Sequence, residues 1–412
     1  MNSKLSGKFA LLYCCTILMV VTTSAAGQAG HLDPTFGRGG IAAKQSTETQ
    51  ITNVYSVGAI AIQGDGKIVV AGGVPGNNDF TVPAVLRFLP NGSLDNNFGL
   101  NGVAVLPNSF GGFGGLAIQP DGKILVSTNG NSSANGQVIR LTSAGTLDST
   151  FGNQGVVTFR LTTVPAIALQ PDGRILASLQ SIINTRSQVT RLLGNGSTDT
   201  SFGTNGIAFP PGGSGAMEVL GNGDILVFGG LISRLTSSGV IDEAFGVNGQ
   251  LIAPTSGQAV AASGDILAAG ALVSDPTVPS SGFAAFAYQS VGIGDPAFGR
   301  NGGVSTTVAN FPTISTAGMA IESTGAIVEL GTVSNKNAGA FGLVRYTAQG
   351  QLDATFGSGG TATTTFGSGT TPNASAIAIQ SDDKIIAAGT VFAAGLHGEF
   401  TTALVVARYL GK

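Results

Sequence analysis

Seven copies of one motif in this 412-residue sequence predict an all-β fold, a seven-bladed β-propeller made of four-stranded antiparallel blades. The motif D-x-x-F-G recurs at intervals of 43 to 62 residues, and a second motif built round a tight turn recurs between its copies. No segment with the apolar spacing of a helix recurs. Because the units keep their order while their lengths differ, we expect constant strands joined by variable loops.

The pattern of each unit predicts four short strands, which we name a, b, c and d in chain order. Strands a and b flank an Asp-Gly turn, as in "AIAIQGDGKIVVAG" (59–72), and Asp-Gly between alternating apolar residues is a strong hairpin signal. Strand c is an apolar run that ends in Arg, and strand d follows D-x-x-F-G after a second glycine turn. The Arg positions are Arg87, Arg140, Arg191, Arg234, Arg345 and Arg408, and the remaining unit has Ala287 instead.

The Phe of D-x-x-F-G is expected to lie between neighbouring blades, where burial of its ring contributes roughly 2–3 kcal/mol. A residue that repeats in every unit is more simply a packing element than an aromatic platform for a ligand. The Gly that follows would permit a bulge or a positive φ, and the repeated Asp and Arg are interpreted as a turn former and its structural partner. The Phe positions are Phe36, Phe98, Phe151, Phe202, Phe245, Phe298 and Phe356.

The two ends of the sequence predict how the ring closes. The last unit has strands a, b and c (376–410) but no strand d, whereas residues 32–43, "LDPTFGRGGIAA", are a strand d without the other three. Pairing of residues 32–43 with the last strand would complete the seventh blade as its outer strand. An open stack of sheets would instead leave a long unpaired edge at each end.

Strand a alternates small and large residues, and alternate residues face opposite sides of a strand. We therefore expect the small face of one blade to pack on the large face of the next, so that the inner strands approach one another round a central channel. The small positions are Ala61, Ala117, Ala168, Ala259, Ala320 and Ala378, and the large ones are Ile62, Ile118, Leu169, Val260, Ile321 and Ile379.

These motifs also suggest a family. The succession "LAIQPDGKILVS" (116–127), "VIRL" (138–141) and "TLDSTFG" (146–152) resembles the delta-60 repeat family of exported bacterial proteins. It is similar, more distantly, to the NHL-type propeller blade, in which the strand before the Asp-Gly turn is innermost. The resemblance covers roughly residues 31–410 and implies a β-propeller, but no particular activity.

Residues 1–26 have the features of a secretory signal peptide. Lys4 and Lys8 precede the apolar stretch "FALLYCCTILMVV", and "SAAGQA" offers small residues for cleavage after Ala26 or Ala29. The apolar stretch has 13 residues, fewer than the ~20 that cross a bilayer, although an uncleaved anchor is the alternative. We expect residues 27–412 to form a single propeller domain without a membrane span, extracytoplasmic and either periplasmic or secreted.

Composition narrows the class of partner. Both cysteines, Cys14 and Cys15, lie in the predicted signal, so the exported chain would hold together without disulfides. Removal of residues 1–26 leaves 17 basic and 22 acidic residues, a net charge of about −5, and no basic patch for nucleic acid is visible. Only 10% of the residues are charged, so Gly, Ser, Thr and Asn must form most of the surface.

The sequence offers little for catalysis, and no catalytic or cofactor-binding residue is assigned. It has two histidines, His31 and His397, and no zinc-binding His pair or G-x-S-x-G motif. The sequence leaves open whether the protein binds Ca²⁺. The turns contain Asp and Asn, but they do not resemble an EF-hand or a nonapeptide calcium loop. Two carboxylates interrupt the apolar pattern: Glu218 at a small position of strand a, and Glu329 in strand b. Glu218 is a candidate channel residue, for which an inter-blade ion pair or a hydrated site is the simpler interpretation.

Sequence variation predicts which face of the disc binds a partner. The a–b and c–d turns share one face and hardly vary, whereas the b–c and d–a loops share the other, and the b–c loops differ in length and composition in every unit. Rigidly held variable loops commonly carry binding sites. The candidate partner-binding residues are Asn77, Asn78, Asp79, Phe80, Asp275, Lys336, His397 and Glu399.

Three functions are compatible with this sequence. The first is a binding or scaffolding propeller, which we expect to be monomeric, whose partner is a protein or glycan of the cell envelope. The second is a hydrolase or lyase with a metal in the channel near Glu218, and the single acidic residue on the inner strands argues against it. The third is a purely structural envelope protein.

Overall fold

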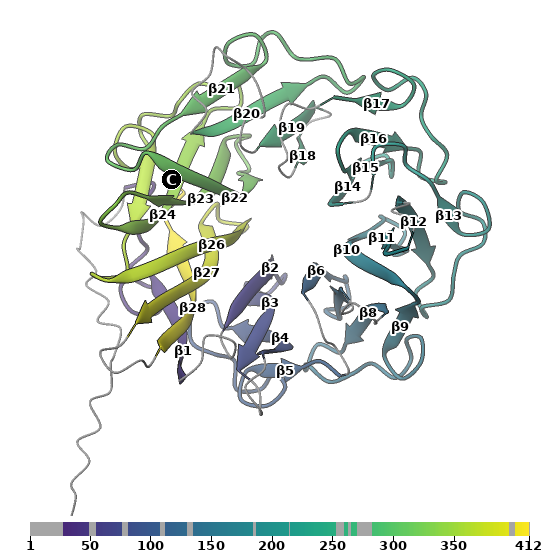
Figure 1. Cartoon of the computed structure of the whole chain (residues 1–412), viewed down its shortest axis with the longest axis horizontal. Coiled ribbons are helices and arrows are strands. Elements are labelled where there is room, and N and C mark those ends of the chain that lie inside the picture. Colours follow the sequence, from purple (N-terminus) through teal and green to yellow (C-terminus); the bar gives the residue numbers. More distant parts are fainter. Residues whose placement is uncertain are drawn as a thin grey trace, which may run out of the picture.

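The structure is a computed structural model, and it shows seven four-stranded antiparallel sheets arranged round a common axis (Figure 1). It describes residues 28–48, 55–75, 81–107, 112–129, 135–183, 187–213, 215–252, 259–262, 265–269, 282–394 and 400–411. The predicted signal peptide, residues 1–26, lies outside the described residues. Within the described part, no helix is long and apolar enough to cross a membrane.

Each sheet is one blade, and in six of the seven sheets the strands pair in chain order from the centre outward. Strands β2, β6, β10, β14, β18, β22 and β26 lie closest to the axis in Figure 1. The predicted seven-bladed propeller is therefore confirmed. The strands of blade 1 are β2 (Ser56–Ile62), β3 (Ile68–Pro75), β4 (Thr81–Phe88) and β5 (Val103–Val105); of blade 2, β6 (Phe113–Ile118), β7 (Ile124–Thr128), β8 (Gly136–Leu141) and β9 (Val156–Phe159); of blade 3, β10 (Thr162–Leu169), β11 (Ile175–Ser181), β12 (Ser187–Leu192) and β13 (Ile207–Ala208); of blade 4, β14 (Met217–Val219), β15 (Ile225–Phe228), β16 (Ile232–Leu235) and β17 (Gln250–Leu251).

Blades 5 and 6 follow the same order, whereas blade 7 has β1 as its outermost strand and so contains both ends of the described chain. Their strands are, in blade 5, β18 (Ala259–Ala262), β19 (Asp265–Ala269), β20 (Phe283–Tyr288) and β21 (Gly303–Thr306); in blade 6, β22 (Thr313–Ile321), β23 (Ile327–Ser334), β24 (Gly339–Tyr346) and β25 (Thr361–Thr364); in blade 7, β26 (Thr370–Ile379), β27 (Ile385–Ala394), β28 (Phe400–Tyr409) and β1 (Ile41–Glu48).

The ring closes as the sequence predicts, by pairing of β1 with β28. The register runs from Ile41 opposite Ala407 to Glu48 opposite Phe400. The outer strand therefore begins at Ile41 and extends beyond residue 43, whereas residues 32–40 form the turn before it, anchored by a bridge between Leu32 and Tyr409. The correction follows from the motif itself, because D-x-x-F-G and the glycines after it are turn residues in every blade.

The discontinuity at the closure falls inside a c–d turn. In blade 1 the turn is held by Gly92 N–H donating to Leu89 O (2.8 Å), together with a bond from Leu89 N–H to Ser93 O. In blade 7 the same two bonds join the two ends of the chain, from Gly30 N–H to Leu410 O (2.7 Å) and from Leu410 N–H to His31 O (2.9 Å). The closure thus reproduces an ordinary turn without a covalent link.

Turn chemistry explains the fixed glycines of the motif. Gly99, which follows Phe98, has φ of +53°, and a Cβ there would lie 2.3 Å from the carbonyl oxygen of Val103. Two residues later, Asn101 and Gly102 both have positive φ (52° and 88°), the geometry of a type I′ hairpin turn. The motif therefore places strand d by local backbone geometry.

Blades pack small face on large face, as the strand a pattern predicts. Ala117 of blade 2 lies in one cluster with Ile167 and Leu169 of blade 3. In blade 5 the predicted alignment is wrong by one residue. Val260, not Ala259, pairs with Leu267 and so stands at the position that Ala61 occupies in blade 1. The a–b turn of blade 5 is one residue shorter than in blade 1, where Ile62 pairs with Ile68, and a shift of one position exchanges the two columns of a strand.

Candidate functional site

The face that carries the a–b and c–d turns, here called the turn face, repeats one polar module in six blades. The Arg at the end of strand c forms an ion pair with the Asp of D-x-x-F-G, at N–O distances of 2.6 to 2.9 Å. Within one unit the two residues are eight positions apart. The pairs are Arg87–Asp95, Arg140–Asp148, Arg191–Asp199, Arg234–Asp242, Arg345–Asp353 and, across the ring closure, Arg408–Asp33.

The guanidinium group of this module also connects neighbouring blades. Arg87 Cζ lies 4.4 Å from the centroid of the Phe98 ring, and its guanidinium donates to the carbonyl oxygen of Ser143 in blade 2. Arg408 likewise donates to the carbonyl oxygen of Pro90 in blade 1, at 2.6 Å. The repeated Arg and Asp are therefore structural groups at the blade junctions.

The motif Phe residues lie at the same junctions. All seven are at most 2% exposed. Beside each ring, the backbone N–H of the following Gly donates to the c–d turn of the next blade, for example Gly99 to Ala144 O (2.8 Å) and Gly357 to Ala29 O (2.8 Å). These rings have no face open to a ligand and act in packing.

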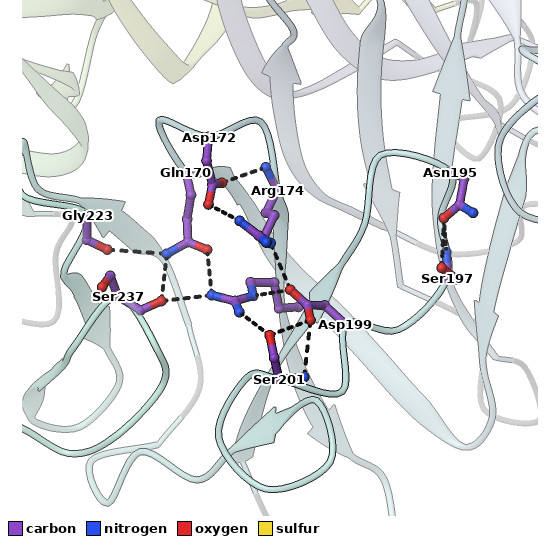
Figure 2. Close-up of polar contacts among 10 residues, drawn as sticks. Gln170, Asp172, Arg174, Asn195, Ser197, Asp199, Ser201, Gly223 and Ser237 are labelled. Carbon is purple, nitrogen blue, oxygen red and sulfur yellow. Dashed lines mark hydrogen bonds and ion pairs between the residues drawn. The ribbon is translucent and has the colours of Figure 1, made fainter.

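Figure 2 shows the module in blade 3 and a member that the sequence reasoning missed. Gln170, just before the a–b turn, accepts a hydrogen bond from Arg191 at 3.2 Å and donates to Ser237 O of blade 4 at 3.0 Å. Arg174 of the a–b turn reaches Asp199 at 2.8 Å. The recurrence of Gln or Glu before the turn, and the constant spacing between Arg and Asp, were the signals available in the sequence.

In two copies of the module, hydrogen bonds and the Arg charge keep the carboxylates of Asp148 and Asp199 ionised. Burial raises the pKa of Asp148, but hydrogen bonds from Thr150 and the charge of Arg140 outweigh it and lower that pKa to about 2. The hydroxyl of Ser201 is the main reason that the pKa of Asp199 also falls to about 2. A carboxylate held ionised by several donors is a poor general acid or base at neutral pH.

A cavity of about 790 Å³ lies between blades 1 and 2 on the turn face. Its charged groups are already paired, Lys67 with Asp65 at 2.5 Å and Asp121 with Lys123 at 3.0 Å. Arg87, at its base, belongs to the junction module. The cavity is polar, but its charges are engaged with one another, which does not resemble a catalytic pair.

Glu218, the candidate channel residue, lies on the innermost strand β14 and is half-buried. It occupies the position of Ala61, since Glu218 pairs with Leu226 as Ala61 pairs with Val69. Burial raises its pKa to about 7. Within the described residues, no group of three or more His, Cys, Asp or Glu side chains lies together in a way that could hold a metal ion.

Glu329 is more deeply buried than Glu218. It lies in β23, where Val70, Val126 and Ala177 stand in blades 1 to 3, and its side chain is fully buried. Burial raises its pKa to about 8, against a smaller opposite effect of the Ala284 backbone N–H. Neither carboxyl oxygen has a hydrogen-bond partner of normal geometry in the described part of the chain.

Seven of the eight predicted partner-binding residues lie outside the described residues: Asn77, Asn78, Asp79, Phe80, Asp275, His397 and Glu399. The eighth, Lys336, lies in the b–c turn of blade 6 and is exposed. Which residues of this face act together is therefore still a prediction.

The described strands do show that this second face is stepped. Strands β27 and β28 of blade 7 have ten residues each, β23, β24, β3 and β4 of the two flanking blades have eight, and β15 and β16 of blade 4 have four. Equivalent Ile residues, Ile385 and Ile225, begin strand b in blades 7 and 4. At ~3.3 Å per residue, the hairpin of blade 7 reaches roughly 20 Å further than that of blade 4.

The fold and its repeated junction module define the class of this protein as a β-propeller with tandem blades. Four segments, residues 63–98, 119–151, 170–202 and 323–356, match a family described as a domain of unknown function (DUF5122) beta-propeller. Each match runs from the a–b turn to the motif Phe of the same unit, in blades 1, 2, 3 and 6. No curated protein matches the chain.

Solved structures resemble the chain at low sequence identity. A catalytically inactive virginiamycin B lyase from Staphylococcus aureus, crystallised with quinupristin, is 12% identical over 88% of this chain and 99% of its own, with a TM-score of 0.46. The polysaccharide lyase Uly1 is 11% identical over 94% of both chains, with a TM-score of 0.46. A PQQ-bound aldose sugar dehydrogenase from Streptomyces coelicolor is 11% identical over 88% of this chain and 98% of its own, with a TM-score of 0.38.

Proposed function

We propose that this protein is an exported binding or scaffolding β-propeller whose partner, a protein or glycan of the cell envelope, contacts the face formed by the b–c and d–a loops. The observation that carries the proposal is the contrast between the two faces. The turn face repeats one hydrogen-bonded module in six blades, and that module joins blade to blade. The strands that lead to the opposite face, here called the variable face, have between four and ten residues.

The shape of the variable face supports a partner that sits to one side of the axis. Blades 6, 7 and 1 are neighbours in the ring, and their b–c hairpins are the long ones. These three hairpins form a raised wall on one side of the face, and the short hairpin of blade 4 lies on the opposite side. Lys336 lies on this wall. In the sequence, Asn78 and Asp79 come between β3 and β4, and Glu399 comes between β27 and β28.

The proposal includes the finer assignments that the sequence suggests. These are the delta-60 repeat type of unit, export through the signal in residues 1–26, and a periplasmic or secreted location for a monomeric chain. The four matches to a β-propeller repeat family support the repeat type at the level of the fold.

The test is capture of envelope material by two matched variants. One variant carries Asn78, Asp79, Lys336 and Glu399 changed to Ala, on the variable face. The control carries Asp65, Lys67, Asp121 and Lys123 changed to Ala, which are exposed or half-buried charges of the turn face. Each immobilised protein is incubated with the envelope fraction of the producing cells, with the unchanged protein as reference.

We expect the variable-face variant to lose the bound species and the turn-face control to retain it, with melting temperatures close to that of the unchanged protein for both. Loss of capture in the control alone would assign binding to the turn face and overturn the proposal. Capture that survives in both variants would show that the predicted residues do not form the site.

A further inference from the structure

The junction between blades 5 and 6 lacks the Arg bridge that the other six junctions have. Ala287 stands at the position that Arg occupies in the other blades. Its side chain can neither pair with Asp295 nor donate a hydrogen bond to the c–d turn of blade 6. The backbone bond from Gly299 N–H to Gln349 O (2.8 Å) is retained, and so is the contact of Gly350 with the ring of Phe298. This junction therefore keeps the backbone bond, and Tyr346 of blade 6 adds a long hydrogen bond to Phe283 O of blade 5 (3.5 Å), but the Arg bridge is missing.

The same junction contains the buried carboxyl of Glu329. Along β23 the odd-numbered positions face blade 5: a Cβ on Gly331 would meet the Phe283 ring, and Ile327 and Val333 share a cluster with Phe283 and Ala285. The even-numbered positions face blade 7, where Thr332 accepts a bond from Ala374 N–H. Glu329 therefore points from blade 6 into the interface with blade 5.

The surroundings of Glu329 are apolar apart from two weak polar neighbours. Met319 and Val344 flank it on β22 and β24. From β24 the titratable group that faces it is Tyr346, whose phenol interacts electrostatically with Glu329 and whose hydroxyl lies 3.5 Å from Phe283 O. From blade 5 it faces the Ala284 backbone N–H. The described titratable groups of that blade lie elsewhere: Asp265 and Arg300 are exposed, Asp295 lies in the turn between β20 and β21, and Tyr288 packs toward blade 4.

We propose that the junction between blades 5 and 6 is the seam at which the ring opens, and that deprotonation of Glu329 opens it. A carboxylate in an apolar interface is strongly disfavoured unless water or a cation reaches it. Separation of blades 5 and 6 admits water to Glu329, and this junction lacks the Arg bridge that resists separation elsewhere. Protonated Glu329 leaves the seam closed.

Thiol accessibility in single-cysteine variants tests this directly, because Cys14 and Cys15 are the chain's only cysteines and both can be replaced by Ser. Ala285→Cys places a thiol in the seam, and Ala388→Cys places one between blades 7 and 1; both alanines are fully buried. The rate of reaction with a neutral aromatic disulfide is measured at pH 6 and pH 9 and divided by the rate of the denatured variant at the same pH.

We expect the corrected rate at position 285 to rise at least tenfold from pH 6 to pH 9, while the rate at position 388 stays nearly constant. Glu329→Gln in the Ala285→Cys background should abolish the rise. An equal rise at both positions, or a rise that persists after Glu329→Gln has removed the charge, would overturn the proposal. Amide hydrogen exchange of the otherwise unchanged protein gives a second measurement: β20 and β23 should lose protection at pH 9 relative to β3 and β27, and uniform exchange would contradict the seam.

Discussion

Replacement of Glu329 by Val should stabilise this protein, and the gain should grow with pH. Val is the residue at the equivalent positions 70 and 126, so the change restores an ordinary apolar position of strand b. The pKa of Glu329 is raised to about 8 in the folded chain from an ordinary value of 4.5. Folding therefore favours its protonated form.

The sign and size of the effect follow from proton linkage. A raised pKa means that the folded chain binds this proton more tightly than the unfolded chain, so the contribution of Glu329 to stability is greatest below pH 4.5 and is lost as the pH rises to about 8. At about 1.4 kcal/mol per pH unit, the free energy of unfolding should fall by roughly 3 kcal/mol between pH 5 and pH 8 on account of this residue. The Val variant lacks this loss.

The assay is urea denaturation of the unchanged protein, Glu329→Val and Glu329→Gln at pH 5, 6, 7 and 8. The difference in unfolding free energy between the Val variant and the unchanged protein should widen steadily over this range. The Glu329→Gln control keeps the shape of the Glu side chain without its charge, so its curve should run parallel to that of the Val variant. A difference that is constant from pH 5 to pH 8 would refute the reasoning, because the carboxyl would then titrate alike in both states.

Six other substitutions test the packing and turn arguments, each by urea denaturation. Phe98→Ala should cost about 3–5 kcal/mol, because it leaves a cavity at a junction where the ring is fully buried, and a loss below about 1 kcal/mol would contradict the packing role. Arg87→Ala should cost about 3–5 kcal/mol, because it leaves Asp95 buried without its partner. Ala287→Arg should instead raise the free energy of unfolding by roughly 1 kcal/mol, because it supplies the missing bridge. If Ala287→Arg gave no gain, the missing Arg would not weaken this junction. Gly99→Ala should cost about 1–2 kcal/mol or more, because φ is +53° and the new Cβ would clash with Val103 O, while Gly64→Ala, where nothing lies within 4 Å, should change little. Asp383→Ala should destabilise, because the Asp383 carboxylate accepts bonds from the Ser323 N–H (2.7 Å) and hydroxyl (2.6 Å) of blade 6, and because Ala tolerates the φ of +60° at this position less well than Asp; a variant of unchanged or higher stability would contradict this.

Much of the fold was predictable because each blade is encoded by short-range chemistry. Alternation of residues such as Ala117 and Ile118 marks a strand, and the glycines after Phe98 mark a turn that needs positive φ. The pairing of the chain ends was predictable because one unit is split between them. The error in blade 5, with Val260 in place of Ala259, arose because a turn shortened by one residue leaves the local pattern almost unchanged while it shifts the register by one position.

The candidate site was less predictable. The sequence singled out Glu329 but did not reveal that its carboxyl faces blade 5, because that depends on which side of β23 meets which neighbour. It noted Ala287 as an exception without revealing that the lost Arg would have reached the next blade. The step between the long hairpin of blade 7 and the short one of blade 4 likewise required the strands to be placed.

The sequence by itself determined the number of blades, the closure of the ring and the turns of every blade except blade 5, since a backbone conformation or a two-residue alternation is decided within a few neighbouring positions. Only the tertiary structure decided what joins one blade to the next and which junction differs. Those contacts bring together residues about fifty positions apart, such as Arg140 and Gly194, and the energy of a buried charge depends on every group that surrounds it in space.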